Sequence, residues 1–431
     1  MKKKIFTLLT ATLISGSAMA SGFQVLLQGN REVAMGNVGV GLRPAASSLF
    51  FNPGAISMMD GNSFAIGFNG IFANNSYYAS HVENSTYTSK TDNPMGTPFH
   101  AYGVFGADGS NLKFGLGIYT PYGSQVNWEE GWVGEQLLDE LTLQAIFVQP
   151  TVSYKITDNL SIGAGFVYMF GKVNLQRSLP ITSQDGPSSL ELDGSANGYG
   201  YNVGVYFTPT EKLSIGFNYR SKVEAEVEDG DASFYNIPMA AMSQFQADKF
   251  GAKLPLPSNT TLGVAYMPMD KLTVSAEVSM VAWSAYEALT FEFNGEINGS
   301  TVSSSPRDYE DAWVFRLGGE YLATEALAVR AGIYYDQTPV QEGYMTPETP
   351  DSDRLGLTAG LGYNVSDRFG IDLSFLYIQG MEREQTIADA ENAGTIVNPD
   401  PANGVDGSQD VLPGTYKLNA FIPGISLSYK F

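Results

Sequence analysis

Residues 21–60 read SGFQVLLQGNREVAMGNVGVGLRPAASSLFFNPGAISMMD. Glycine interrupts this stretch too often for a strand or a long helix, at Gly22, Gly29, Gly36, Gly39, Gly41 and Gly54. Its apolar residues come in short clusters, whereas the rest of the chain alternates apolar and polar residues in one long run after another. We therefore interpret residues 21–60 as a compact plug, and residues 61–431 as a wall that closes around it.

The first 20 residues have the pattern of an export signal. Three lysines precede the apolar run Ile5–Ile14, and Ala18-Met19-Ala20 supplies the small residues of a cleavage site. The apolar run is too short to cross a bilayer as a helix. The sequence thus predicts an exported protein whose mature chain begins at Ser21.

Composition narrows the class of protein. The chain has 431 residues, 47 of them glycine, a net charge of −21 and no cysteine. Disulfides and thiolate chemistry are therefore excluded, and an acidic chain lacks the basic patches that nucleic acid requires. No apolar run is long enough for a transmembrane helix. We expect no cofactor and no metal site, because the Asp-rich stretch Asn398–Asp410 lacks the spacing of an EF-hand.

Alternating segments fill the chain after residue 60. Most exceed the about 9–11 residues that a tilted strand needs to cross a membrane, and short turns alternate with long loops between them. An even number of such strands is typical of bacterial outer-membrane barrels. We predict an all-β fold, a 14-stranded antiparallel transmembrane β-barrel with strands at 63–79, 98–108, 111–123, 142–156, 159–176, 199–208, 212–228, 258–268, 271–290, 307–322, 326–337, 354–364, 368–382 and 415–431.

The alternation assigns a face to each arginine. A basic side chain on the lipid face near the midplane costs about 2–4 kcal/mol, so the strand arginines should point into the lumen. There Arg177, Arg220 and Arg316 are candidates to bind a ligand carboxylate. The alternative is that they pair with lumenal carboxylates, such as those of Glu32 and Glu320, and hold the plug in place.

The chain ends on an alternating strand with a terminal aromatic residue, in which Ile425, Leu427, Tyr429 and Phe431 are apolar. This pattern resembles the signal by which outer-membrane proteins are assembled. We expect the assembly machinery of the outer membrane to recognise this strand.

Several short motifs occur in a fixed order along the chain. They are Ser21-Gly22-Phe23-Gln24, Asn52-Pro53-Gly54, Tyr219-Arg220-Ser221, Trp283-Ser284, Asp311-Ala312-Trp313, Asp353-Arg354 and Tyr429-Lys430-Phe431. In these motifs the whole chain resembles the FadL family of outer-membrane transporters for long-chain fatty acids and other hydrophobic compounds. One departure is Gly54, where the family motif usually has alanine.

The resemblance implies a monomeric barrel in the outer membrane of a Gram-negative bacterium, occluded by an N-terminal hatch. It implies that Phe23 lies near bound ligand, and that ligand leaves sideways beside a kinked third strand. The third strand here contains Gly115, Gly117, Pro121 and Gly123, and proline cannot donate to a strand ladder. The alternative is that Pro121 only ends this strand at the rim.

Two long loops carry apolar residues at near-helical spacing, which predicts short helices with a surface that collects ligand. Trp132 and Leu137 lie in the loop after the third strand, and Met242 and Phe245 in the loop after the seventh. Methionine suits a surface that accepts varied ligands. The alternative is that these helices pack on each other and cap the barrel.

The predicted function is passive transport of long-chain fatty acids or similar hydrophobic compounds. Uptake of monoaromatic hydrocarbons by the same route and a structural or adhesive barrel are the alternatives. An enzyme is not expected, because the chain has no G-x-S-x-G, P-loop or H-E-x-x-H motif. The expected partners are a hydrophobic small molecule, outer-membrane lipid and lipopolysaccharide, and the assembly machinery.

Overall fold

The computed structural model describes residues 22–107, 109–397 and 408–431. The predicted export signal at residues 1–20 lies outside these residues, as does most of the Asn398–Asp410 stretch. In the described part of the chain, no helix is long and apolar enough to cross a membrane. Nor do these residues include a group of three or more His, Cys, Asp or Glu side chains that could hold a metal ion.

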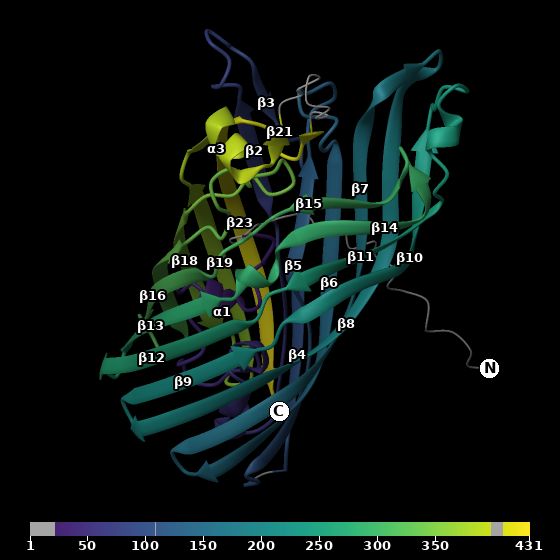
Figure 1. Ribbon diagram of the computed structural model, residues 1–431. Coiled ribbons are helices and arrows are strands. Elements are labelled where there is room, and N and C mark those ends of the chain that lie inside the picture. Colours follow the sequence, from purple (N-terminus) through teal and green to yellow (C-terminus); the bar gives the residue numbers. More distant parts are fainter. Residues whose placement is uncertain (1–21, 108, 398–407) are drawn as a thin grey trace, which may run out of the picture.

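The chain forms a closed, 14-stranded antiparallel β-barrel (Figure 1). Several wall strands are interrupted and carry two labels, one for each part. In order, the wall strands are β1 (Ser63–Asn69) with β2 (Phe72–Tyr78), β4 (Phe99–Phe105), β5 (Leu112–Asn127), β6 (Glu140–Thr157), β7 (Leu160–Ser183), β8 (Gly186–Thr210), β9 (Leu213–Arg220) with β10 (Val223–Tyr235), β12 (Asn259–Met269) with β11 (Lys249–Leu256), β13 (Leu272–Val281) with β14 (Ala288–Ile297), β16 (Ala312–Leu322) with β15 (Ser300–Pro306), β17 (Leu327–Asp336), β18 (Arg354–Asn364), β19 (Phe369–Gly380) and β23 (Gly414–Lys430).

The first and last strands close the barrel. Ser63 of β1 lies opposite Lys430 of β23 on one side and opposite Val104 of β4 on the other. Each of the predicted strands is present in the wall. Short connecting elements complete the chain: β3 (Thr88–Lys90), η2 (Met242–Gln244), η3 (Trp283–Ala285), β20 (Arg383–Gln385), α3 (Ile387–Ala393), β21 (Ile396–Val397) and β22 (Ser408–Gln409).

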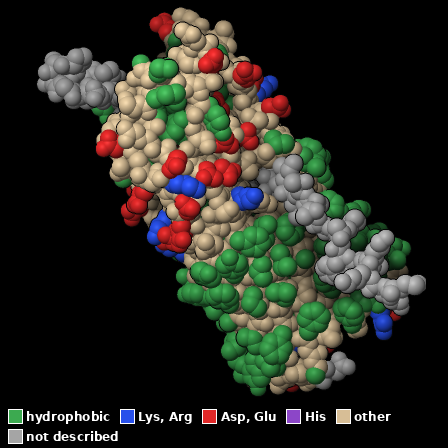
Figure 2. Space-filling view, turned by 90° about the vertical axis from the view of Figure 1, so that its right-hand side faces the viewer, with side chains coloured by type: hydrophobic (Ala, Val, Ile, Leu, Met, Phe, Trp, Pro, Cys, Tyr) green, Lys and Arg blue, Asp and Glu red, His purple; other side chains and the backbone are tan. Residues whose placement is uncertain are grey.

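The lower part of the wall has apolar side chains outside and polar side chains inside. On β16, Phe315 and Leu317 are exposed, whereas Arg316 between them is buried in the lumen. Figure 2 shows the result as a broad hydrophobic field over the lower wall, with acidic and basic side chains gathered above it. The inward direction predicted for Arg220 and Arg316 is confirmed, since both side chains are buried.

Two of the predicted loops are strands instead. Residues 177–198 continue β7 and β8 as a long hairpin, in which Arg177 lies opposite Leu190. Residues 291–306 similarly belong to β14 and β15, where Phe291 lies opposite Ser303. The outward residues of these extensions are polar and charged, so the pattern lacks the outer apolar face by which the membrane strands are recognised.

The short helices predicted in two loops are also wrong. Residues 130–138 form turns and no helix, and Trp132 stacks on Trp128, which precedes these turns, with ring centroids 4.2 Å apart. In the other loop only the three residues of η2 form a 3-10 turn, which ends before Phe245. Glycine explains part of this, because Gly131 adopts a φ of 74°, which a helix does not allow.

Residues 22–60 lie inside the barrel and are almost entirely buried; in Figure 1 they are the purple segments within the wall. They form α1 (Asn30–Val33), α2 (Ser48–Phe51) and η1 (Pro53–Met58). The Asn52 side chain accepts a hydrogen bond from Gly54 N at 3.1 Å and donates to the carbonyl oxygen of Val205 in β8 at 2.9 Å. Asn52 thus shapes the start of η1 and attaches it to the wall.

Ion pairs hold the same segment at its lower end. Arg31 pairs with Glu320 of β16 at 3.1 Å, and Glu320 also pairs with Arg330 of β17 at 2.7 Å. Arg330 in turn pairs with Asp372 of β19 at 2.5 Å. This network is the plug-binding alternative considered for lumenal arginines, although it uses residues other than Arg177, Arg220 and Arg316.

Gly54 provides a test of how tightly the segment is packed. A Cβ atom at this position would lie 2.6 Å from the carbonyl oxygen of Gly204 in β8, which is well below van der Waals contact. We expect Gly54→Ala to lower the thermal unfolding midpoint, measured by heat-dependent mobility of the detergent-solubilised barrel. Gly319→Ala is the matched control, because the nearest atom to its Cβ would be 3.6 Å away. Equal midpoints for the two variants would contradict the close approach.

Candidate functional site

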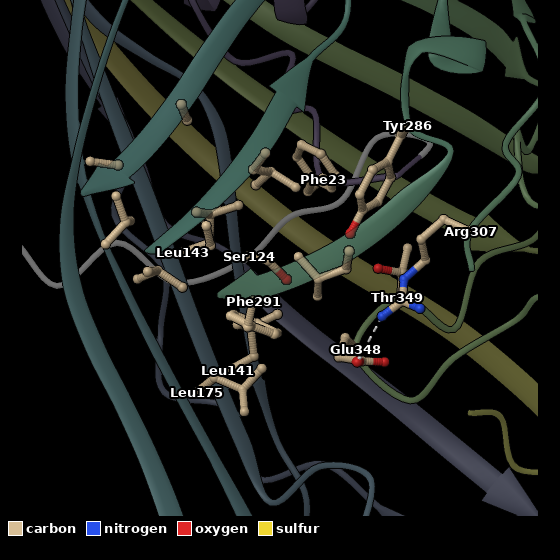
Figure 3. A pocket seen from close by; sticks show the side chains of 17 residues that line it. Phe23, Ser124, Leu141, Leu143, Leu175, Tyr286, Phe291, Arg307, Glu348 and Thr349 are labelled. Atoms are coloured by element: carbon tan, nitrogen blue, oxygen red, sulfur yellow. Dashed lines mark hydrogen bonds and ion pairs between the residues drawn. The ribbon is translucent and has the colours of Figure 1, made fainter. Parts of the chain in front are cut away.

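A cavity of about 80 Å³ lies between the N-terminal segment and the upper wall, and Figure 3 shows it from close by. Its lining is almost entirely apolar, with polar groups at one end. The lining residues are Phe23, Ser124, Leu141, Leu143, Val173, Leu175, Ala196, Ala225, Val227, Ala252, Leu254, Tyr286, Leu289, Phe291, Arg307, Glu348 and Thr349. We call it the upper pocket.

The apolar lining arises where long wall strands exchange the polarity of their two faces, as β7 shows. On β7, Phe166 and Phe170 face outward and are exposed, but two residues further on the outward residue is Lys172. The inward face changes in the opposite sense, from Ser161 low on the strand to Leu175 in the pocket. Below the change the outside is apolar, as lipid requires. Above it the outside is polar and the inside is apolar, as in a water-soluble domain.

The neighbouring strand β8 shows the same exchange. Tyr201 and Tyr199 are exposed on the outside, and Asp193 is exposed at the upper level. On the inside, Asn202 is buried low on the strand and Leu192 is buried high on it. Aromatic residues mark the edge of the membrane in barrels of this kind. The upper pocket therefore lies above the lipid core.

Phe23 closes the pocket with an aromatic cluster. Its ring packs edge-on against Trp283 at 4.8 Å and against Tyr286 at 5.8 Å between centroids. Tyr286 in turn packs against Tyr309 at 5.1 Å. In Figure 3 Phe23 and Tyr286 project toward the same space. The side chain of Phe23 is almost fully buried, so a ligand that enters the pocket makes contact with it.

The polar end of the pocket is an ion pair. Arg307 contacts Glu348 at 3.2 Å and donates to the Ser305 hydroxyl at 2.6 Å. Burial lowers the pKa of Arg307, but the Glu348 carboxylate and the hydroxyls of Tyr286 and Tyr309 together raise this pKa by more, so it is raised overall. Arg307 is therefore charged, and one Glu348 oxygen, Oε2, is buried without a hydrogen-bond partner among the described residues.

A second cavity of about 80 Å³ adjoins the first, and we call it the outer pocket. The two share Leu175, Leu289, Phe291, Arg307 and Glu348, so the ion pair lies where they meet. The outer pocket is also lined by Arg177, Leu137, Phe293 and Asp410. No carboxylate of the described residues lies within ion-pair distance of Arg177. The two cavities are therefore neighbours: the upper pocket is almost entirely apolar, and the outer pocket combines apolar side chains with polar and charged ones.

The structure separates the residues that the sequence singled out. Phe23 lines the upper pocket, and Arg177 and Leu137 line the outer pocket. Arg220 and Arg316 line a third cavity lower in the barrel. Trp132, Met242 and Phe245 line neither the upper nor the outer pocket: Trp132 is fully buried under Trp128, Met242 is 58% exposed, and Phe245 packs on Phe234 at 5.1 Å.

Sequence reasoning missed the ion pair of Arg307 and Glu348, because both residues lie in connections without a repeating pattern. A signal for the apolar wall was present, however. In residues 224–228 three glutamates alternate with Ala225 and Val227, which is the pattern of a strand with water outside and an apolar interior.

The third wall strand, β5, is irregular at the predicted place. It pairs with β4 only as far as Tyr119, and its register against β6 shifts between Tyr119 and Tyr122. The strand nevertheless continues through Pro121 to Asn127, so the alternative that Pro121 ends it is wrong. Gly115 has a packing role, because a Cβ there would lie 2.2 Å from Leu49.

Above Tyr119 the N-terminal segment takes the place of β4 as the partner of β5. Val25 N donates to the carbonyl oxygen of Pro121 at 2.8 Å, and Gly123 N donates to that of Phe23 at 3.0 Å. These bonds flank an antiparallel bridge between Gln24 and Tyr122. The residue that closes the upper pocket is thus also paired, through its main chain, with the irregular strand.

Comparison with known proteins identifies the family. The family described as outer membrane protein transport protein (OMPP1/FadL/TodX) matches residues 11–431. The chain is a member of this family. It is 24% identical to the long-chain fatty acid transport protein of Escherichia coli O6:H1, over 88% of this chain and 93% of that protein. A putative outer membrane protein of Neisseria meningitidis serogroup B is also 24% identical, over 100% of this chain and 98% of the other.

Solved structures share the fold. A Pseudomonas aeruginosa FadL homologue has a TM-score of 0.79 at 19% identity, covering 95% of this chain and 100% of that chain. The Pseudomonas putida toluene transporter TodX has a TM-score of 0.69 at 17% identity, covering 97% and 99%. The OMPP1/FadL/TodX family consists of outer-membrane transporters of hydrophobic compounds and not of enzymes. The predicted family and its location in the Gram-negative outer membrane are confirmed.

Filling the upper pocket tests its role. In Ala225→Phe the new ring occupies apolar volume that two or more ligand carbons would otherwise use, at about 0.8 kcal/mol each. We expect the affinity for the bound hydrophobic compound to fall about tenfold or more, measured by calorimetric titration with palmitate and with toluene. Ala276→Phe is the control, because Ala276 faces outward on β13. An unchanged affinity in Ala225→Phe would place the ligand elsewhere.

Proposed function

We propose that this transporter carries long-chain fatty acids, or amphiphiles of the same build, passively across the outer membrane. The observation that supports this most is the pair of adjoining pockets: the outer one combines apolar side chains with Arg177 and Arg307, and the upper one is apolar and has Phe23 in its lining. An amphiphile has the complementary form, with one charged group and a long apolar chain.

The energetics favour such a ligand. Each methylene transferred from water to an apolar lining gains about 0.8 kcal/mol, so a long alkyl chain supplies most of the affinity. The carboxylate needs a cation in this apolar setting. Arg307 is already paired with Glu348, whereas Arg177 is not within ion-pair distance of any described carboxylate. We assign the carboxylate to Arg177 rather than to Arg220 or Arg316.

Capture begins at the upper end of the barrel. Met239 is 88% exposed and Met242 58% exposed in the connection between β10 and β11. Flexible, polarisable methionine side chains suit a surface that accepts varied apolar ligands. In this scheme the loop containing Met242 and Phe245 collects the ligand, and Leu137 receives it at the outer pocket.

Release follows from the double attachment of Phe23. A ligand that fills the upper pocket displaces the Phe23 ring, and displacement of the ring strains the main-chain bonds that join Phe23 and Val25 to β5. Loss of these bonds opens the wall beside Thr120 and Pro121, where β5 has already left β4. In this scheme residues 21–60 act as a hatch, and the ligand leaves sideways into the membrane.

Uptake of a neutral aromatic hydrocarbon is the second candidate. The charges that line the two pockets already balance, since Arg177 and Arg307 stand against Glu348 and Asp410. A neutral ligand would leave that balance intact, and it would use only the apolar lining and the aromatic cluster at Phe23. The two candidates differ in whether Arg177 contributes to binding.

The remaining partners follow from the surface. We propose that the hydrophobic field of Figure 2 contacts outer-membrane lipid and that the charged band above it faces lipopolysaccharide. The last strand carries an exposed Phe431, which suits recognition by the assembly machinery. With one complete barrel formed by a single chain, a monomer suffices for transport.

Neutralising Arg177 distinguishes the two candidate ligands. In Arg177→Gln we expect the affinity for palmitate to fall about tenfold, because a carboxylate in an apolar setting loses a charge-assisted hydrogen bond. The affinity for toluene should not change. Arg368→Gln in the exposed turn between β18 and β19 is the control. Toluene binding without palmitate binding in the unmodified protein would favour the hydrocarbon candidate, and binding of neither would refute both.

A reversible crosslink tests the release step. Residues 24 and 122 face each other in a non-hydrogen-bonded antiparallel pair, whose usual Cα separation of about 4.5 Å suits a disulfide. The chain has no other cysteine. In oxidised Gln24→Cys/Tyr122→Cys, we expect cells to lose palmitate uptake and to regain it when a reductant is added. Uptake that is equal in the oxidised and reduced states would rule out separation of the N-terminal segment from β5.

A further inference from the structure

A third cavity, of about 30 Å³, lies low in the barrel between the N-terminal segment and the wall. It shares no lining residue with the upper or outer pocket. One side belongs to the N-terminal segment, and the other to β9, β12, β13 and β16. Its lining consists of Leu26, Asn37, Val40, Phe50, Phe51, Asn218, Arg220, Asn259, Thr261, Glu277, Ser279 and Arg316. We call it the lower cavity.

Arg220 is a buried cation without a carboxylate partner. The residue is 5% exposed, and it donates to the carbonyl oxygen of Phe50 at 2.6 Å while its guanidinium lies 3.8 Å from the centre of the Phe50 ring. The Tyr119 hydroxyl is a further polar neighbour. All three are neutral groups. The Nε atom has no hydrogen-bond partner among the described residues, and none of their carboxylates lies within 4 Å.

Arg316 has a similar environment. It is 6% exposed, donates to the Ser279 hydroxyl at 2.5 Å, and its Nε also has no partner in the described part of the chain. Glu277 lies opposite it in the strand register. However, one Glu277 oxygen accepts hydrogen bonds from Gly39 N and Val40 N, both at 2.5 Å, and Glu277 forms no ion pair with Arg316 at the 4 Å limit.

The charges that line the lower cavity do not balance. Two arginines and one glutamate line it, which leaves one positive charge in excess within the lining. Asp336 of β17 is a further buried carboxylate that attracts Arg316, but it does not line the cavity. An isolated charge taken out of water is costly unless a counter-charge accompanies it. A cavity of about 30 Å³ is larger than the roughly 10–15 Å³ that one water requires, so it has room for one small ion.

We propose that the lower cavity binds a compact monovalent anion, either chloride or the carboxylate head of an amphiphile, between Arg220 and Arg316. The anion neutralises the excess charge of the lining and accepts hydrogen bonds from the two guanidinium groups. Because Phe50 and Val40 belong to the N-terminal segment while Arg220 and Arg316 belong to the wall, the bound anion fastens that segment to the barrel.

Bromide tests the site directly, because it replaces chloride and scatters anomalously. Crystals of the unmodified protein soaked in sodium bromide should show an anomalous peak within contact distance of both guanidinium groups. Crystals of Arg316→Gln should lack the peak. The experiment on the unmodified protein does not depend on whether any variant folds. A lower cavity that holds only water would overturn the proposal.

A measurement in solution tests whether the bound anion attaches the N-terminal segment to the barrel wall. The thermal unfolding midpoint of the solubilised protein should be higher in sodium chloride than in sodium gluconate of the same ionic strength, because gluconate is too large for the cavity. The difference should vanish in Arg316→Gln and persist in Arg368→Gln, whose side chain is exposed in a turn. Equal midpoints in the two salts for the unmodified protein would contradict the role.

Palmitate identifies the source of the anion. If saturating palmitate removes the bromide peak and leaves density for a head group, the lower cavity takes carboxylates and is a second station on the transport path. If the peak persists, the site takes an inorganic ion; both results leave the anion site standing. The first result rests on the proposed transport of fatty acids, whereas the bromide peak does not, so failure of that function would leave the peak unchanged.

Discussion

The wall of this barrel is surrounded by lipid in its lower part and by water above the membrane. A strand that reaches both levels must suit both surroundings. In the lower part lipid surrounds the outside, so Phe166 and Phe170 face outward and the polar side chains face inward. Above the membrane, water surrounds the outside, and Lys172 and Asp193 take the outward positions. Since a strand has only two faces, the polar outer face leaves the inner one for apolar residues. The apolar lining of the upper pocket is a direct result of this exchange.

The same exchange divides the lumen into two chemical regions. The lower lumen is polar, and it holds the N-terminal segment by hydrogen bonds and ion pairs, such as those of Asn52 and Arg31. The upper pocket is mostly apolar; Phe23 and its aromatic neighbours line it, and the ion pair of Arg307 and Glu348 lies at one end. A hydrophobic compound would therefore contact a mostly apolar surface above Phe23 and a polar surface below it. The proposed sideways exit at this level would avoid the polar region.

Periodicity was sufficient to predict the wall but not the site. Each strand of the barrel was found from its period of two, and the same period gave the inward direction of Arg220 and Arg316. It could not give their neighbours, because the Phe50 carbonyl that Arg220 contacts is 170 residues away in the chain. The upper hairpin of β7 and β8 was missed because its outer face is polar. Arg307 and Glu348 were missed because their loops show no repeating pattern of apolar and polar residues. Trp128 and Trp132 have helical spacing but stack in a turn, since tertiary packing outweighs local spacing there.

A closed barrel normally has no free strand edge, yet β5 retains one above Tyr119, and Phe23 to Val25 cover it as an added strand. Near hydrocarbon, every main-chain group exposed by removing that cover costs several kcal/mol unless water or ligand replaces it. The state in which residues 23–25 have separated from β5 is therefore short-lived unless a ligand takes their place. Its free-energy cost grows with the number of main-chain hydrogen bonds that are broken. Among the described residues, two main-chain bonds and the bond from the Gln28 side chain to the Thr120 carbonyl oxygen join the segment to β5. Separation of the segment from β5 would therefore break few bonds, and the bonds could re-form without rearrangement of the wall. A longer added strand would seal the barrel permanently, and a shorter one would let it leak.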